Sequence, residues 1–347
     1  MARERVTSFD VAREAGVSQS AVSRAYTPGA SIAKATKEKV LAAALKLGYQ
    51  PNAIARSLIS RRSNMIGIVM ADIVNPFYPA VLDMFLRQLQ ERGHRVMLFM
   101  ATRGQTIDDL LPQLLEYQVD GVVITSSTLS SEMAEHCARL GTPVALFNRY
   151  VANVEASSVC CDNIGAGRAV ADLLLDAGHQ QLGYIAGIEN TSTNKDREYG
   201  FSSRIEERRA KPMRREVGNY TYEDGYQAAL RLFEASPTPD AIFCANDIMA
   251  LGALDALRGP LKLRVPEDVS VIGFDDISAS SWQGYRLTSI RLPVERMVET
   301  TINHLIERIE NPDTPLLATL ESIELAIRDS ARLPEHIGLY HTWEKVD

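Results

Sequence analysis

Short apolar runs alternate with longer amphipathic stretches along most of the chain, from about Met65 onward. Eight of these runs have the composition of β-strands: IGIVMAD, VMLFMA, GVVITSS, PVALFNR, SVCCDN, LGYIAG, AIFCAND and VSVIGFDD. Segments with apolar residues at helical spacing, such as PFYPAVLDMFLRQLQERG and AGRAVADLLLDAG, separate them. Apolar strands that alternate with helices are typical of parallel sheets covered by helices on both faces.

An internal similarity indicates that this region forms two lobes. Eight strands over about 260 residues are many for one sheet, and both LQERGHRVMLF and LLDAGHQQLGYI read as a helix, a Gly-His pair and a strand. We expect Gly93 and Gly178 to end equivalent helices. The predicted fold is an α/β core of two doubly wound parallel-sheet lobes with a ligand cleft between them. The predicted bounds are 64–340 for the core, about 64–162 plus 291–322 for its N-terminal lobe, and about 163–290 plus 323–340 for its C-terminal lobe.

The first 50 residues have a different pattern, with three short helices. These helices are expected to begin at caps formed by Ser8, Ser18 and Thr36 and to end near Ala15, Ala25 and Gly48. Gly16 permits a tight turn between the first two helices. The positions expected to face inward are Ala12, Ala15, Val22, Val40, Leu41, Ala44 and Leu45. The pattern predicts a small all-α helix-turn-helix domain over residues 1–50.

Residues 51–63 form the predicted boundary between the two parts, as a hinge helix and linker. Pro51 suits the first position of a short helix over Asn52–Leu58. So short a helix is marginal alone, because helix nucleation is unfavourable. We therefore expect this hinge segment to fold only against a partner.

Charge is distributed unevenly along the chain, whose net charge is −7. Residues 1–62 contain 11 Lys and Arg against 4 Asp and Glu, or +7, which leaves −14 for residues 63–347. A basic N-terminal part followed by an acidic body suggests that only the first part binds a polyanion such as nucleic acid.

Several other chemistries find no support in the sequence. There is no CxxC motif or Cys/His cluster, so no metal site is expected, and reduced, buried thiols are expected at Cys137, Cys160, Cys161 and Cys244. GAGRAV resembles part of a dinucleotide-binding loop, but Val170 occupies the place of its third glycine. Asp275 and Asp276 are expected to point apart because they are adjacent at a strand end. We therefore expect no enzymatic activity and no cofactor.

The chain also lacks the signals that direct a protein to or across a membrane. No apolar run approaches 18 residues, and the start MARERVTSFD has no apolar signal-peptide core. We expect a cytoplasmic protein.

Seven stretches of the chain, taken together, match a known family. They are SFDVAREAGVSQSAVSRAY, LGYQPNAIARSL, IGIVMADIVNPFYPAVL, DGVVI, GHQQLGYIAG, CANDIMALGAL and VPEDVSVIGFDD, which fall in the same order over about residues 6–335. On these motifs the chain resembles the LacI/GalR family of bacterial transcription regulators. The N-terminal and hinge motifs are the specific ones, since periplasmic sugar-binding proteins share the core motifs. The resemblance implies a periplasmic-binding-protein-like core.

The resemblance implies base contacts on the second N-terminal helix. In helix-turn-helix domains the first residues of that helix enter the major groove. Gln19 and Ser20 lie in its first turn and Arg24 one turn later, at positions that read bases in the family. Gln suits adenine, Arg suits guanine and Ser is permissive, whereas the alternative is an ordinary solvated helix face. Phosphate contact or helix capping is expected of Ser8, Ser18, Ser23, Thr36 and Asn52.

The resemblance implies a second DNA contact in the hinge segment. Two hinge helices of a homodimer would pair in the minor groove, where Leu58 would wedge between base pairs and kink the DNA. Ala55 is small enough for close approach to the groove wall. Docking of Leu58 onto the core is the alternative.

The resemblance also implies an effector pocket in the cleft. Sugar sites combine aromatic surface with carboxylates, amides and arginines that satisfy hydroxyl groups. The matching positions are Phe77, Tyr78, Asn148, Thr193, Arg197, Tyr220, Asn246, Asp275 and Trp282. Asn148 stands where many relatives have Asp, and Thr191 stands where purine-binding relatives have Arg. The second difference favours a sugar or glycoside over a nucleobase.

Taken together, the sequence predicts a repressor that binds a pseudo-palindromic operator in double-stranded DNA as a homodimer. Closure of the lobes on the effector would change the spacing of the hinge helices and hence operator affinity. The tail HIGLYHTWEKVD has no leucine heptads, which favours a dimer over a tetramer. The alternative is a sugar-binding protein or sugar-processing enzyme without a regulatory role. Effector identity, operator sequence and the direction of the effect are left open.

Overall fold

The chain divides into two compact units, residues 1–63 and 64–347. The computed structural model describes residues 6–27, 29–50, 62–70, 73–101, 106–125, 131–151 and 156–334. The predicted hinge residues Asn52, Ala55 and Leu58 lie outside these ranges.

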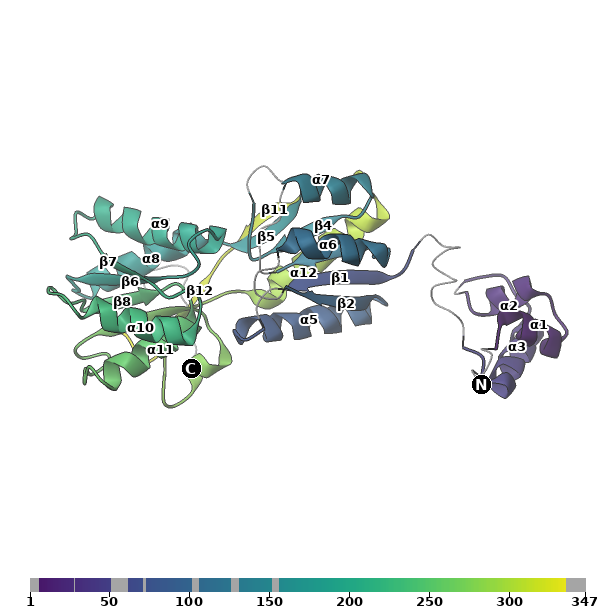
Figure 1. The fold of residues 1–347 in the computed structure, drawn as a ribbon, viewed down its shortest axis with the longest axis horizontal. Coiled ribbons are helices and arrows are strands. Elements are labelled where there is room, and N and C mark those ends of the chain that lie inside the picture. The colour runs from purple at the N-terminus through teal and green to yellow at the C-terminus, as the bar shows by residue number, and fades with distance from the viewer. Residues whose placement is uncertain are drawn as a thin grey trace. The chain divides into compact units, whose positions relative to one another are not determined.

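In its described residues the N-terminal unit contains three helices, α1 (Ser8–Ala15), α2 (Gln19–Ala25) and α3 (Lys34–Leu47) (Figure 1). Gly16 and Gly48 end α1 and α3 in the left-handed conformation, and the Ser18 hydroxyl caps α2. The buried residues shared by the three helices are Val11, Ala12, Val22, Ala25, Val40, Ala43 and Ala44. This is the helix-turn-helix arrangement that the sequence predicts.

Two of the predicted helix starts are wrong by one to three residues. Thr7 caps α1 instead of Ser8, because Thr7 and Asp10 form a reciprocal capping box. The third helix begins after Ala33, so Thr36 lies inside its first turn and caps nothing.

The inward face of α3 also differs from the prediction. Leu41 and Leu45 are 41% and 85% exposed, whereas Val40, Ala43 and Ala44 are buried. The spacing i, i+3, i+4 selects one stripe of a helix, and the two leucines fall on the neighbouring stripe.

The second unit contains two six-stranded sheets, one in each lobe (Figure 1). The strand order of the first sheet is β11-β5-β4-β3-β1-β2, with bounds Ala318–Glu321, Ser157–Cys161, Val144–Phe147, Gly121–Ile124, Met65–Met70 and Arg95–Met100. The order of the second is β12-β10-β9-β8-β6-β7, with bounds Glu324–Ala326, Thr288–Arg291, Ser270–Asp275, Ala241–Cys244, Leu182–Ala186 and Arg214–Val217. Strand β12 runs antiparallel to β10, and the other pairings in both sheets are parallel.

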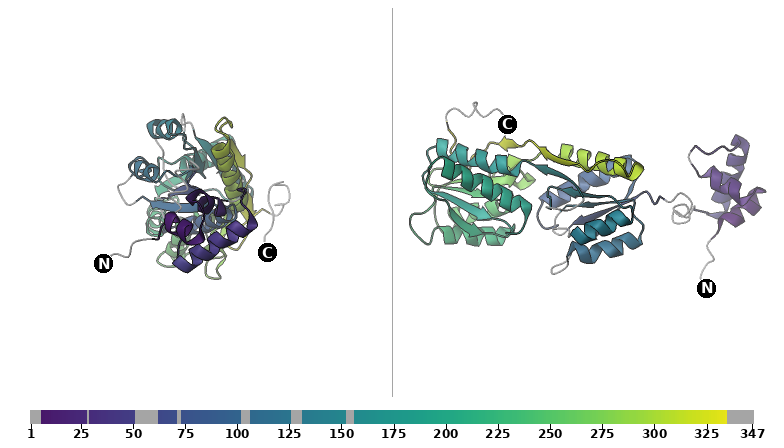
Figure 2. Two further views of the ribbon diagram at one scale, coloured as in Figure 1. Left: turned by 90° about the vertical axis from the view of Figure 1, so that its right-hand side faces the viewer. Right: turned by 90° about the horizontal axis from the view of Figure 1, so that it is seen from above.

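Helices cover both faces of each sheet, as the alternating pattern predicts (Figure 2). In the first lobe they are α5 (Phe77–Glu91) and α12 (Val294–Glu310) on one face and α6 (Ile107–Glu116) and α7 (Ser131–Arg139) on the other. Successive residues of one strand point to opposite faces of the sheet. Ile68 of β1 therefore packs in the hydrophobic cluster that includes α5, and Val69 packs in the cluster that includes α6. In the second lobe the pairs are α8 (Asn163–Asp176) with α9 (Ser192–Glu207) and α10 (Tyr222–Leu232) with α11 (Asp247–Arg258).

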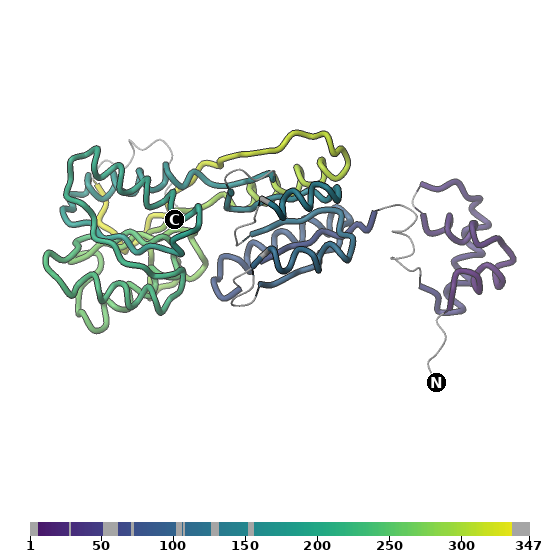
Figure 3. The backbone as a smooth tube through the Cα atoms, turned by 45° about the horizontal axis from the view of Figure 1, so that its top comes forward, coloured from purple at the N-terminus to yellow at the C-terminus, as the bar shows by residue number. Residues whose placement is uncertain are grey.

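The chain passes between the lobes three times (Figure 3). The crossings follow β5, β10 and β11, since β6, β11 and β12 belong to the opposite sheet. Gly93 and Gly178 have left-handed backbone after α5 and α8, and each is followed by a His whose N–H bonds five residues back, to Leu89 or Leu174. The internal similarity in the sequence is therefore a repeated helix end.

All eight apolar runs form strands, but β7, β10, β11 and β12 were not predicted. Three of these four lie at a sheet edge. Edge strands need no apolar side chains on both faces, and RREV, ATLE and ELA are partly charged.

Both helix pairs of the second lobe cross at glycines. A Cβ added to Gly167 of α8 would lie 2.3 Å from the backbone oxygen of Arg197, and one on Gly200 of α9 would lie 2.2 Å from the oxygen of Ile164. The other pair repeats this, since a Cβ on Gly252 of α11 would lie 2.2 Å from the oxygen of Tyr222. Backbone is in direct contact at these crossings, which leaves no room for a side chain.

We predict that Gly167→Ala lowers the free energy of unfolding by about 1–3 kcal/mol, because α8 and α9 must move apart. The measurement is denaturant unfolding of the full chain followed by circular dichroism. Gly284→Ala is the matched control, since nothing lies within 4 Å of the Cβ it would add. Equal effects of the two substitutions would contradict the close packing.

Candidate functional site

A cavity of about 990 Å³ lies at the carboxyl ends of the strands and is lined by residues of both lobes. Eight of the nine predicted effector residues line it: Phe77, Tyr78, Asn148, Thr193, Arg197, Tyr220, Asn246 and Asp275. They come from strand ends, from the segments just after them, or from the first two turns of the helices that follow. This is the expected position for a ligand in open parallel sheets.

Trp282 does not line this cavity. Its side chain is 60% exposed and follows the short 3₁₀ helix Ser278–Ser281, so it lies at the protein surface.

Arg197 is held from several sides in the second lobe. Its side chain is only 2% exposed, and its guanidinium carbon lies 3.4 Å from the centre of the Phe274 ring. Its Nε donates to Oδ1 of Asn163 at 2.8 Å, and Nη1 donates to the carbonyl oxygen of Ala245. Its Nη2 lies 3.7 Å from Asp275. These partners fix the plane of the guanidinium and leave one edge for the carboxylate and the cavity.

Asp275 and Asp276 have left-handed backbone, with φ of 108° and 51°, and their side chains point in different directions. Asp275 faces Arg197 and the cavity, while Asp276 pairs with Arg291 at 2.6 Å and Arg328 at 2.7 Å. Burial raises the pKa of Asp275 to about 7, against the opposing effect of nearby guanidinium groups. Strained backbone at non-glycine residues is typical of binding sites.

Asp247 holds the segment that follows Asp275 in place. Its buried carboxylate accepts bonds from the Ile277 N–H at 2.9 Å and from the hydroxyls of Ser280 at 2.6 Å and Ser289 at 2.5 Å. Burial raises the pKa of Asp247 to about 8, and the neighbouring Asp275 adds to the effect. The loop that follows Asp275 is therefore held by one carboxylate.

Tyr220 forms one wall of the cavity. Its hydroxyl lies 3.1 Å from the hydroxyl of Thr193 and 3.4 Å from that of Thr191. Gly187 permits this position, since a Cβ there would lie 2.0 Å from the tyrosine ring. The side chain of Asn246, in contrast, is partly used for structure, because its Oδ1 caps α11 at the Met249 N–H.

Sequence reasoning missed several lining residues. The apolar and uncharged polar lining residues that were not predicted include Ile73, Val74, Asn75, Met100, Ile188, Asn219, Tyr222 and Ile248. The charged ones are Arg149, Glu223 and Asp224. Arg149 could have been found, since it follows Asn148 directly after β4. Met100 ends β2, while Tyr222, Glu223, Asp224 and Ile248 lie in the first turns of α10 and α11. The remaining residues come from connecting segments whose course the sequence does not predict.

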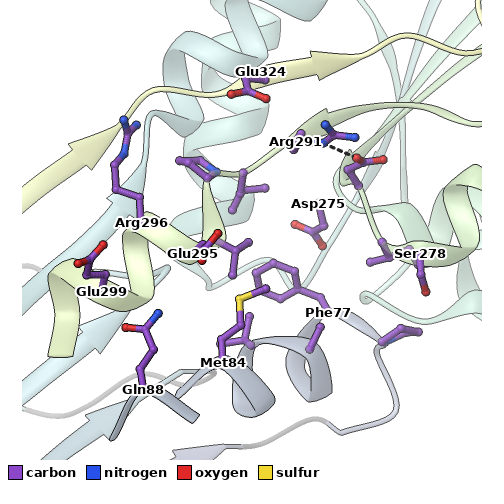
Figure 4. A pocket seen from close by; sticks show the side chains of 18 of the residues that line it. Phe77, Met84, Gln88, Asp275, Ser278, Arg291, Glu295, Arg296, Glu299 and Glu324 are labelled. Atoms are coloured by element: carbon purple, nitrogen blue, oxygen red, sulfur yellow. Dashed lines mark hydrogen bonds and ion pairs between the residues drawn. The ribbon is translucent and has the colours of Figure 1, made fainter. Parts of the chain in front are cut away.

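A second cavity, of about 980 Å³, lies against α5, α12 and the crossing segments (Figure 4). Phe77 and Asp275 line both cavities. Figure 4 shows these two side chains directed toward the same space, with Glu295, Arg296 and Glu299 of α12 around it. Phe77 and Asp275 therefore belong to the wall that the cavities share.

The N-terminal unit presents its predicted base-reading residues to solvent. Gln19, Ser20 and Arg24 are exposed on α2. Gln19 and Arg24 make long bonds within the domain, from Gln19 Nε2 to the Ser8 hydroxyl at 3.3 Å and from Arg24 Nε to the Ser20 carbonyl at 3.4 Å. The hydroxyl of Ser20 lies 2.9 Å from that of Ser18. Ser18 and Ser23 are also exposed, and Ser8 and Thr36 are partly buried.

The other sequence expectations concern cysteines, metals and membranes. The four cysteines are free and buried, as expected, and burial raises the pKa of Cys161 to about 12. In the described ranges, no group of three or more His, Cys, Asp or Glu residues is placed to hold a metal ion. Within the same ranges, no helix is both long and apolar enough to span a bilayer.

Comparison with known proteins identifies the family. Residues 9–52 match the model for bacterial regulatory proteins of the lacI family, and residues 171–331 match a periplasmic binding protein-like domain. The chain is 32% identical over 337 residues to the probable HTH-type transcriptional repressor ExuR of Bacillus subtilis (strain 168), covering 94% of this chain and 98% of the relative. The chain belongs to the LacI family. It is a DNA-binding transcriptional regulator, as its relatives are.

Solved structures agree with this assignment. A lac repressor dimer bound to operator and the anti-inducer ONPF superposes with a TM-score of 0.85 at 27% identity, covering 94% of this chain and 99% of that one. A complex of the transcriptional regulator CelR with cellobiose gives a TM-score of 0.70 at 29% identity, covering 94% of this chain and 100% of that one.

We predict that Asp275 and Asp247 contribute stability that is lost as pH rises from about 4 to 8, because they keep their protons to higher pH in the folded chain than in the unfolded one. Asp275→Asn should remove part of this slope. The measurement is the Tm of the full chain at several pH values across this range. A change of about 1 kcal/mol in the free energy of unfolding shifts Tm by about 2–4 °C.

Asp268→Asn serves as the control for this pH dependence. Its ion pair with Arg264 holds the pKa of Asp268 at about 2, so its contribution to stability changes only below about pH 5, and this variant should keep the full slope above that pH. A slope that is the same in Asp275→Asn and in the unaltered chain would show that Asp275 does not titrate there.

Proposed function

We propose that this LacI-family protein is a homodimeric repressor whose operator affinity is set by a sugar or glycoside bound in the 990 Å³ cavity. The observation that carries the proposal is the buried pair of Arg197 and Asp275 inside a cavity that aromatic side chains also line. Arginine donates and aspartate accepts, so together they can bind adjacent hydroxyl groups of a sugar. Phe77 and Tyr220 offer apolar surface for the faces of a sugar ring.

The relatives support both parts of the proposal. The solved lac repressor is a dimer on operator DNA, and CelR has been solved with cellobiose. The DNA would be bound by Gln19, Ser20 and Arg24 in the major groove, with Ser8, Ser18, Ser23 and Thr36 near phosphates. Because its target is chromosomal DNA, the protein would act in the cytoplasm.

Coupling between the sites would run through the three crossing segments. Ligand contacts on both lobes favour a closed arrangement, and rotation of one lobe about the crossings would move the segment that leads to the N-terminal unit. Operator and effector would then change each other's affinity by the same factor.

The test is fluorescence anisotropy of the purified chain with DNA from upstream of its own gene. Specific binding that weakens steeply with salt supports the proposal, since phosphate contacts release counterions. Equal affinity for this DNA and for scrambled DNA would overturn it.

We predict that Arg24→Ala weakens operator binding by about 1–3 kcal/mol, the cost of losing one bidentate base contact, and weakens binding to scrambled DNA much less. Lys46→Ala is the matched control in the same domain, because Lys46 is paired with Glu14 at 2.6 Å. It should change both affinities slightly and alike. A uniform loss in Arg24→Ala would assign Arg24 to phosphate instead of a base.

A further inference from the structure

Arg149 is a cation of the cavity that the proposed sugar site does not use. It follows β4 directly, lines the cavity and is only 8% exposed. Its Nη2 donates a long bond of 3.4 Å to the hydroxyl of Tyr78, and its buried Nε has no hydrogen-bond partner in the described part of the chain. A buried guanidinium with an unused donor is costly unless something pairs with it.

The charges inside the cavity do not balance. Its buried ionisable groups are Arg149, Arg197 and Asp275, so two guanidinium groups face one carboxylate. Glu223 and Asp224 also line the cavity, but Glu223 is exposed and Asp224 only partly buried, where water screens them. The raised pKa of Asp275, about 7, reduces its negative charge further at neutral pH. The interior thus carries an excess of at least one positive charge.

Asn148, which precedes Arg149, sets a second requirement for the ligand. Its buried Oδ1 is an acceptor without a partner among the described residues. A ligand that satisfies both neighbours must donate a hydrogen bond to Asn148 and accept one at Arg149. A hydroxyl group next to an anionic oxygen meets both conditions. A carboxylate also matches the flat fork of a guanidinium, and its single charge equals the excess.

We propose that the effector is a sugar acid, whose carboxylate binds Arg149 and whose hydroxyl groups bind Asn148 and the pair of Arg197 and Asp275. This inference rests on the proposed function, because it names the class of ligand for the same cavity. A neutral sugar would leave the charge of Arg149 unpaired in the bound state.

The test is isothermal titration of the full chain at pH 7.5 with matched pairs that differ by one carboxylate: D-glucose and D-glucuronate, and D-galactose and D-galacturonate. In at least one pair the acid should bind about tenfold or more tightly than the neutral sugar, as expected for one charge-assisted contact. The same acid should change operator affinity in the anisotropy assay.

Arg149→Gln should abolish the preference for the acid, so that the acid and its neutral sugar bind this variant with affinities within about threefold of each other. Arg149→Lys keeps the charge and should retain part of the preference, which guards against a variant that fails to fold. Arg168→Gln is the control, since Arg168 pairs with Glu207 at the surface and does not line the cavity.

The outcomes separate the two proposals. A neutral sugar that binds as tightly as its acid, or a preference that survives in Arg149→Gln, overturns the sugar acid and leaves the sugar effector standing. Binding of no member of either pair, with no effect on operator affinity, counts against both.

Discussion

The burial of a single guanidinium group, that of Arg197, determines the geometry of the ligand cavity. It joins α9 to α8 through Asn163, to the end of β8 through Ala245, and to β9 through Phe274 and Asp275. Each bond to a buried charge is stronger than one between neutral groups, and each missing partner would leave a costly unpaired donor. In the second lobe, the ends of β8 and β9 therefore contact the same buried guanidinium group.

The close helix crossings at glycines also help to position Arg197 in the cavity. Gly167 and Gly200 bring the backbones of α8 and α9 into contact, and the carbonyl that meets Gly167 is that of Arg197 itself. Asp247 acts similarly on the opposite side, where it holds the loop after Asp275. Packing and polar contacts thus position the arginine and the aspartate independently, which is how a site becomes rigid before a ligand arrives.

Much of this architecture is predictable from sequence because buried central strands must be apolar on both faces. Edge strands such as β7 escaped prediction, since one side of an edge needs no neighbour and tolerates charge. Family resemblance pointed to Arg197 and Asp275, which line the cavity, and to Trp282, which does not line it and follows a short 3₁₀ helix at the surface. It also passed over Arg149, although that residue directly follows Asn148 at the end of β4, where its position beside a predicted site residue is a usable signal.

Two side chains form a wall that is shared by the two cavities of the second unit. Phe77 and Asp275 border both the space between the strand ends and the space beside the crossing segments. A mutation that changes this wall would alter the ligand cavity and the space beside the crossing segments together. Under the proposed coupling, the choice of ligand and the strength of the genetic response then depend on the same two side chains.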